Sequence, residues 1–236
     1  MHAGTDEQGQ AQEEAPEPSP KLGSRMQHIQ LLLVKQGAKP ALRMVISEEQ
    51  LPGLSGFCRQ QGLALVTSGR KVKVLGIPGK NEGYVDKGVA IPRDDPAPGR
   101  PIVFIAQDMN TAVALKAAED LGNHDEMGRL LGYPSCCIRF FGEHLEDQRE
   151  GDLSFLRPMM LASAKTTYPK TMNIFARHQD AAVLFHCPCS LDCAPSQRMA
   201  QQYLHIIEEQ EPALAESIDA QLQGTVEQDG HSYRFV

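Results

Sequence analysis

Short apolar runs separated by glycine, proline and polar residues fill the first half of the chain, up to about residue 107. Runs of this length between turn residues are typical of β-strands. The pattern therefore predicts strands at 29–34, 42–46, 63–67, 72–77 and 101–105.

The segments between these runs carry helix and loop signals. Ser47-Glu48-Glu49-Gln50 has the form of a capping box, in which the serine and glutamine side chains bond to the free amides of a first helical turn. It predicts a helix that continues to about Gln61. Prolines, glycines and aspartates crowd residues 78–100 and predict a loop, and Ser68-Gly69 interrupts two of the strands.

Beyond Asp108 the spacing of apolar residues becomes helical. Gly122 and Gly132 are typical residues for helix ends, and Pro134 is typical of a helix start. We expect helices at 111–121, 123–132, 134–145, 153–164 and 193–207, and a terminal strand at 232–236. The fold class predicted is α+β, with a mixed, β-rich N-terminal half and a helical C-terminal half that carries a cysteine-rich site.

The predicted organisation has three parts. Residues 1–24 hold most of the net charge of −7 and almost no apolar side chains, so they predict a disordered acidic tail. Residues 25–107 form an α/β subdomain, and residues 108–236 form a mainly helical subdomain with the cysteine cluster. The boundary near residue 107 either separates two subdomains or marks a step within one domain.

Charge and hydropathy exclude several classes of function. Outside the acidic tail the chain is nearly neutral, which argues against nucleic-acid binding because phosphate contacts need clustered lysine and arginine. No apolar stretch is long enough to span a membrane, and the N-terminus lacks the features of a secretory signal. We therefore expect a cytoplasmic protein, in which cysteines stay reduced and serve metal binding or catalysis.

Five of the six cysteines fall into two clusters about fifty residues apart. We expect them to form one cofactor site, built from Cys136, Cys137, Cys187, Cys189 and Cys193. Cys136, Cys137 and Cys193 lie at predicted helix starts, where free amides and the helix dipole favour the thiolate that binds metals. Cys58 stands alone in an apolar pattern and predicts an ordinary core residue.

The spacing leaves the identity of the metal open. The paired Cys-x-x-Cys of a zinc ribbon and the cysteine run of bacterial ferredoxins are both absent. Adjacent helical residues point about 100° apart, so Cys136 and Cys137 reach a multi-iron cluster more easily than one ion. A four-iron cluster bound by Cys136, Cys137, Cys189 and Cys193 is the leading prediction, and zinc is the alternative.

The two clusters also resemble a known family. The strings Gly132-Tyr133-Pro134-Ser135-Cys136-Cys137 and His186-Cys187-Pro188-Cys189-Ser190, followed by Cys193 and Ser196, are similar to the signature of the prokaryotic family "domain of unknown function 483". The similarity covers roughly residues 125–205. It implies a shared site that includes His186 and Ser196 besides the cysteines, with Cys187 at a variable position, and it implies no particular activity.

Three functions follow as hypotheses. The first is an iron–sulfur protein whose open iron acts on a small-molecule substrate, in sulfur transfer or non-redox chemistry, with His186 as a ligand or proton carrier. The second is a structural zinc site in a protein that binds a partner. The third is thiol redox chemistry at Cys187, Cys189 and Cys193. Around the site, Asn173 and Arg177 are candidates for orienting an anion, Tyr133 for a lid, and His144 for a solvated surface residue.

Overall fold

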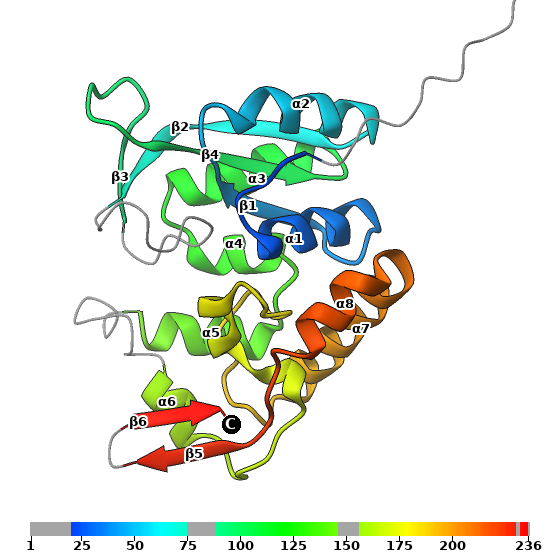
Figure 1. Ribbon diagram of the computed structural model, residues 1–236. Helices are drawn as coiled ribbons and strands as arrows, with labels where there is room; N and C mark the ends of the chain where they lie inside the picture. The colour runs from blue at the N-terminus through cyan, green and yellow to red at the C-terminus, as the bar shows by residue number, and fades with distance from the viewer. Residues whose placement is uncertain (1–19, 75–87, 146–155, 230–231, 236) are drawn as a thin grey trace, which may run out of the picture.

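A four-stranded antiparallel sheet organises the first half of the described chain (Figure 1). The computed structural model describes residues 20–74, 88–145, 156–229 and 232–235. The strand order is β1 (Ala41–Val45), β4 (Arg100–Ala106), β2 (Ala64–Val74) and β3 (Gly88–Pro92). The central strand β4 pairs with β1 from Ala41↔Ala106 onward and with β2 from Ala64↔Ala106 onward.

Helices cover both faces of this sheet. Strand side chains alternate between the faces, and in β4 Val103 and Ile105 belong to one core while Phe104 belongs to the other. The first core packs against α1 (Arg25–Lys35) and α2 (Gln50–Gln60); the second packs against α3 (Met109–Asp120) and α4 (His124–Leu130). Because β4 is buried on both faces, it reads in the sequence as a continuous apolar run.

The second half of the chain builds a separate core from helices and irregular segments. Its elements are α5 (Ser135–Glu143), α6 (Leu156–Leu161), two 3-10 helices (Lys170–Met172 and Ile174–Gln179), α7 (Ala194–Gln210), α8 (Pro212–Asp219) and the hairpin of β5 (Val226–Asp229) and β6 (Ser232–Phe235). Little regular structure lies between α6 and α7, yet residues 181–184 are fully buried there. Among the described residues, no helix is long and apolar enough to cross a membrane.

Helix α1 belongs to both cores. Its residues Leu31 and Val34 pack in the sheet core, whereas Ile29, Leu32 and Leu33 pack in the core of the second half. The strand predicted at 29–34 is therefore wrong. A helix that is buried on opposite sides loses its amphipathic pattern, and a short continuous apolar run does not distinguish it from a strand.

The start of α1 is fixed from the second half of the chain. Ser24 caps the helix by accepting a hydrogen bond from the amide of Gln27, and Ser24 also donates to the carboxylate of Asp180. That carboxylate accepts from the amide of Met26 at 3.1 Å. A carboxylate at this position satisfies free amides and the positive end of the helix dipole.

The α+β class is confirmed, together with the strands β1 and β4, the helices α2, α3, α4 and α7, and the terminal strand β6. The sequence did not predict α8 or β5, and the sheet differs from the prediction in two places. The strands predicted at 63–67 and 72–77, the latter described only to residue 74, form one strand, β2, because a shift of register between Thr67 and Lys71 absorbs Ser68-Gly69 without a turn. Strand β3 lies inside the predicted loop, where it pairs with the outer part of β2.

The two halves share elements across residue 107. Helices α3 and α4 follow that residue in the chain but pack on the sheet, and α1 precedes it but completes the second core. Two predictions fall partly outside the described residues: the acidic tail at 1–24, of which 1–19 are not described, and the helix at 153–164, of which α6 is the described part.

We expect Leu33→Ala to destabilise both halves together. Leu33 is fully buried in the second core, so its truncation should lower the free energy of unfolding by about 2–5 kcal/mol. Hydrogen exchange should then speed up in β4 as well as in α7, since α1 joins the two cores. The exposed Lys35→Ala on the same helix is the control, and faster exchange confined to α7 would contradict a shared core.

Candidate metal centre

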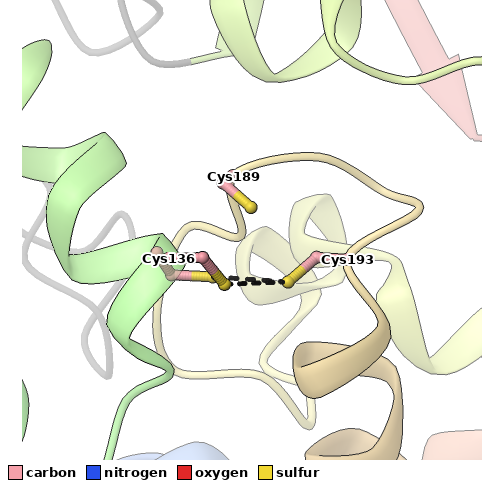
Figure 2. A group of neighbouring side chains, drawn as sticks. Cys136, Cys189 and Cys193 are labelled. Atoms are coloured by element: carbon pink, nitrogen blue, oxygen red, sulfur yellow. Dashed lines mark hydrogen bonds between the residues drawn. The ribbon is translucent and has the colours of Figure 1, made fainter.

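Four cysteine sulfurs converge at one point in the second half of the chain. They belong to Cys136, Cys137, Cys189 and Cys193, and all four Sγ atoms lie within 4.8 Å of one another. The sulfur–sulfur distance is 3.6 Å from Cys193 to Cys136 and 3.6 Å from Cys193 to Cys137. Figure 2 shows Cys136 on α5, Cys189 on the loop that leads to α7, and Cys193 at the start of α7.

A tight turn places the first pair of sulfurs. Helix α4 ends at Leu130, and Gly132 follows it with a φ of +79°. Gly132 lies against Pro40, so a Cβ there would come within 2.7 Å of the proline ring. Pro134 is the N-cap of α5, and Cys136 and Cys137 lie in the first helical turn. Both adjacent cysteines reach the site, with their sulfurs 3.9 Å apart. The 100° between them therefore does not keep either sulfur out of the group.

A loop held by side-chain hydrogen bonds places the second pair. The amide of Leu191 donates to the hydroxyl of Ser163 at 2.9 Å, and the amide of Ala164 donates to the carboxylate of Asp192 at 2.7 Å. Leu191 itself is fully buried. Cys193 is the N-cap residue of α7, whose first turn contains a proline. The buried Leu191 and the start of α7 thus hold the loop in place, and the sulfurs of Cys189 and Cys193 join those of Cys136 and Cys137.

Behind the sulfurs lies a buried serine–histidine pair. The hydroxyl of Ser196 is 3.3 Å from the sulfur of Cys137 and 2.9 Å from Nε2 of His186. Ser196 is fully buried on α7, and His186 is 8% exposed. A hydroxyl in this position links the imidazole to the thiol, so the residues implied by the family resemblance form one connected hydrogen-bonded group.

The sulfurs do not share protons equally in the metal-free protein. Hydrogen bonding from Cys137, assisted by Ser196, lowers the pKa of the Cys193 thiol, and the same pairing with Cys193 together with burial raises the pKa of Cys137. Burial, followed by the neighbouring Cys193, raises the pKa of Cys189. The group thus stabilises one thiolate with protonated thiols around it, and a bound cation would replace those protons.

A buried lysine connects the centre to the sheet half of the protein. Lys39 is fully buried, and its Nζ donates to the carbonyl of Leu131 at 2.9 Å. The ammonium also lies 4.7 Å from the centre of the Tyr133 ring, a cation–π arrangement. Tyr133 in turn packs on the His186 ring at 4.9 Å and donates to the carbonyl of Phe185 at 3.0 Å.

A cavity of about 270 Å³ adjoins the centre. Cys137, His186 and Tyr133 line it on the side of the sulfurs, and Phe141 and Arg177 line it elsewhere. Burial, reinforced by the charges of Lys39 and Arg177, lowers the pKa of His186 to about 3, so this imidazole is neutral at physiological pH. The cavity wall therefore includes the neutral His186 and the cationic Arg177, together with His124 and the thiols of Cys137 and Cys187 among apolar side chains.

The structure brings together four of the five cysteines predicted to form the site. The sulfur of Cys187 instead lies 3.9 Å from the sulfur of Met159, and burial raises the pKa of this thiol to about 11. Cys58 is buried in the sheet core, as expected for a packing residue. His144 lies at the end of α5, where its Nδ1 meets the carbonyl of Phe140 at 2.9 Å.

Asn173 and Arg177, the two candidates for orienting an anion, lie in different surroundings. Asn173 caps a 3-10 helix by accepting from the amide of Ala176, so its buried amide has a structural role. Arg177 lies at the cavity. Lys39 was not predicted, because a lysine beside a proline in a turn gives no sign in the sequence that it is buried.

No protein-family model, no curated protein and no solved structure matches the chain. The resemblance to the family "domain of unknown function 483" therefore stays a prediction.

We expect Lys39 to make stability depend on pH. Burial lowers its pKa from 10.5 to about 7, so between these values the unfolded chain holds a proton that the folded chain lacks. The free energy of unfolding should therefore rise by about 1.4 kcal/mol per pH unit across this window. Urea unfolding of the wild type and of Lys39→Met at several pH values isolates the effect.

The difference in stability between wild type and Lys39→Met should move in favour of the wild type as pH rises. Lys35→Met, which changes an exposed lysine in α1, is the matched control and should show no such trend. Parallel pH profiles for wild type and Lys39→Met would mean that Lys39 keeps its proton when folded.

Proposed function

We propose that this protein is a metal-thiolate protein in which Cys136, Cys137, Cys189 and Cys193 hold a single metal ion, with zinc as the metal that fits best. The observation that carries the proposal is the convergence of four sulfurs within 4.8 Å. Free thiols in separate segments have no reason to gather in this way for packing alone, whereas four thiolates around zinc form a common structural site.

The sulfur spacing supports one ion. Four thiolates bound at about 2.3 Å in a tetrahedron around zinc stand about 3.8 Å apart. The separations among the sulfurs of Cys136, Cys137 and Cys193 are 3.6, 3.6 and 3.9 Å, and all four sulfurs lie within 4.8 Å of one another. In a four-iron cluster each thiolate binds a different iron, so the ligand sulfurs lie farther apart than around one ion. The iron–sulfur cluster thus stays a prediction that the spacing does not favour.

The proposed role of the ion is structural. Four protein ligands leave no open position for a substrate, which is the pattern of structural zinc sites. The segment between α6 and α7 contains only short 3-10 helices, so it depends on contacts other than a helix or sheet ladder. An ion bound by α5, this segment and α7 would contribute its binding free energy to the folding of the second half.

Such a centre needs reduced thiols, so we also propose that the protein works in a reducing compartment such as the cytoplasm. A thiol-redox role for Cys189 and Cys193 requires that the metal leave first. The same metal measurement therefore separates the three functions that the sequence suggested.

Protein purified without oxygen should be colourless and contain about one zinc ion per chain. Cys193→Ser should lose the metal, since this sulfur contacts both Cys136 and Cys137. Cys187→Ser is the matched control, because its sulfur lies outside the group of four. Elemental analysis and an absorption spectrum make the measurement.

Two results would overturn the zinc proposal. A brown protein with absorption near about 400 nm and several irons per chain would establish a cluster instead. Wild-type protein that contains no stoichiometric metal but forms a disulfide between Cys189 and Cys193 on mild oxidation would favour the redox function.

Ser196→Ala should weaken metal binding by about tenfold to a hundredfold while leaving the four ligands in place. The loss is expected because the hydroxyl joins the Cys137 sulfur to His186, and partners of this kind orient metal ligands. Competition with a chromophoric chelator measures the affinity. Ser190→Ala, which changes a half-buried serine in the loop before α7, is the control. Equal affinities for the two variants would show that the Ser196 hydroxyl does not support the site.

A further inference from the structure

The cavity beside the metal centre lies between the two halves of the protein. α4 supplies Met127 and Gly128 to its wall, α5 supplies Ile138 and Phe141, and the segment before the second cysteine cluster supplies Arg177. Its volume of about 270 Å³ is that of a site for a small organic molecule. Cavities between packed units are frequent ligand sites, because such walls close around a ligand from several elements.

The walls have an uneven chemistry. Met127, Leu131, Ile138 and Phe141 provide apolar surface, and no aspartate or glutamate is among the described residues that line the cavity. Arg177 and His186 add polar groups to the same wall. The guanidinium of Arg177 acts on His186, so this part of the wall has a positive charge although the imidazole itself is neutral.

A buried polar group also faces this environment. His186 is 8% exposed, its Nε2 is paired with Ser196, and its Nδ1 has no hydrogen-bond partner among the described residues. Buried polar atoms are nearly always paired in native proteins, so an unpaired one in a cavity wall is a sign of a ligand or an ordered water. Arg177, which also lines a second cavity of about 170 Å³ near α1, supplies a planar cation suited to a carboxylate.

We infer that the cavity bounded by Tyr133, Ile138, Phe141, Arg177 and His186 binds a small carboxylate that has an apolar body. The carboxylate lies at Arg177, and the apolar body lies against Met127, Ile138 and Phe141. The centre then has a second task besides holding the fold, since Cys137 and the loop that carries His186 form part of the ligand wall. This site is independent of which metal the four cysteines bind.

Phenylacetate is a suitable probe, because it combines a carboxylate with an aromatic ring and fits the volume. A fragment of this size with one charge-assisted contact should bind with a dissociation constant of about 1 mM. Titration of the metal-loaded full chain, labelled at methionine and isoleucine methyl groups, should shift Met127 and Ile138 in a saturable way. 2-Phenylethanol, which lacks the charge, and inorganic phosphate, which lacks the apolar body, should each bind at least about tenfold more weakly.

Variants test the anchor. Arg177→Gln should weaken phenylacetate binding by about tenfold or more, whereas Arg139→Gln should leave it unchanged, since Arg139 is an exposed arginine on α5 that pairs with Glu143. Metal content measured on the same samples should stay the same in both variants. A loss of metal with retained ligand binding would count against the metal proposal alone.

Three results would overturn the inference. The first is the absence of a saturable shift at Met127 and Ile138 with phenylacetate up to about 20 mM. The second is equal binding of 2-phenylethanol, which removes the role of Arg177, and the third is equal binding of phosphate, which removes the role of the apolar wall. These comparisons use the wild type, so they decide the question even if Arg177→Gln fails to fold, since the Nε of Arg177 also donates to the carbonyl of Ile174 at 2.7 Å.

Discussion

The mutual approach of four cysteine sulfurs ties the second half of this protein together. Cys136 and Cys137 come from the first turn of α5, while Cys189 and Cys193 come from a loop that ends at α7. Few regular hydrogen-bond ladders support that loop, so its conformation depends on the packing of Leu191 and on whatever holds the sulfurs. A metal ion at the proposed site would supply such a constraint, because it would join four separate thiols into one rigid group.

The layer behind the sulfurs connects this centre to the rest of the molecule. Ser196 on α7 touches the Cys137 sulfur, and His186 in the preceding loop is paired with Ser196. Tyr133 packs on His186, and Lys39 lies over Tyr133. Lys39 belongs to the connection between α1 and β1, so Lys39 and Tyr133 link the sheet half to the centre. The proposed ligand cavity opens along the same contact, where a bound carboxylate would touch both halves.

Sequence patterns predicted the elements that pack against a single core and the strand at the centre of the sheet. Short apolar runs between turn residues marked β1 and β4, and capping signals marked α2 and α4, because these depend on neighbours in the chain. Asn123 caps α4 as predicted, whereas at α2 only the Gln50 half of the capping box forms and Glu49 is the N-cap residue. The error at α1 has the opposite cause. Its apolar residues face two different cores, so the pattern lost the spacing that identifies a helix, and only the position of the second core explains it.

The sequence by itself determined which residues have metal-binding chemistry, since thiols at helix starts and around a proline have that property wherever the fold places them. It also marked His186 and Ser196, through the family resemblance. Tertiary structure alone decided that Cys136 and Cys137 both reach the group, that Cys187 packs against Met159, and that a buried lysine stands behind the site. These outcomes depend on distances between segments about fifty residues apart, which chain packing sets and local sequence does not.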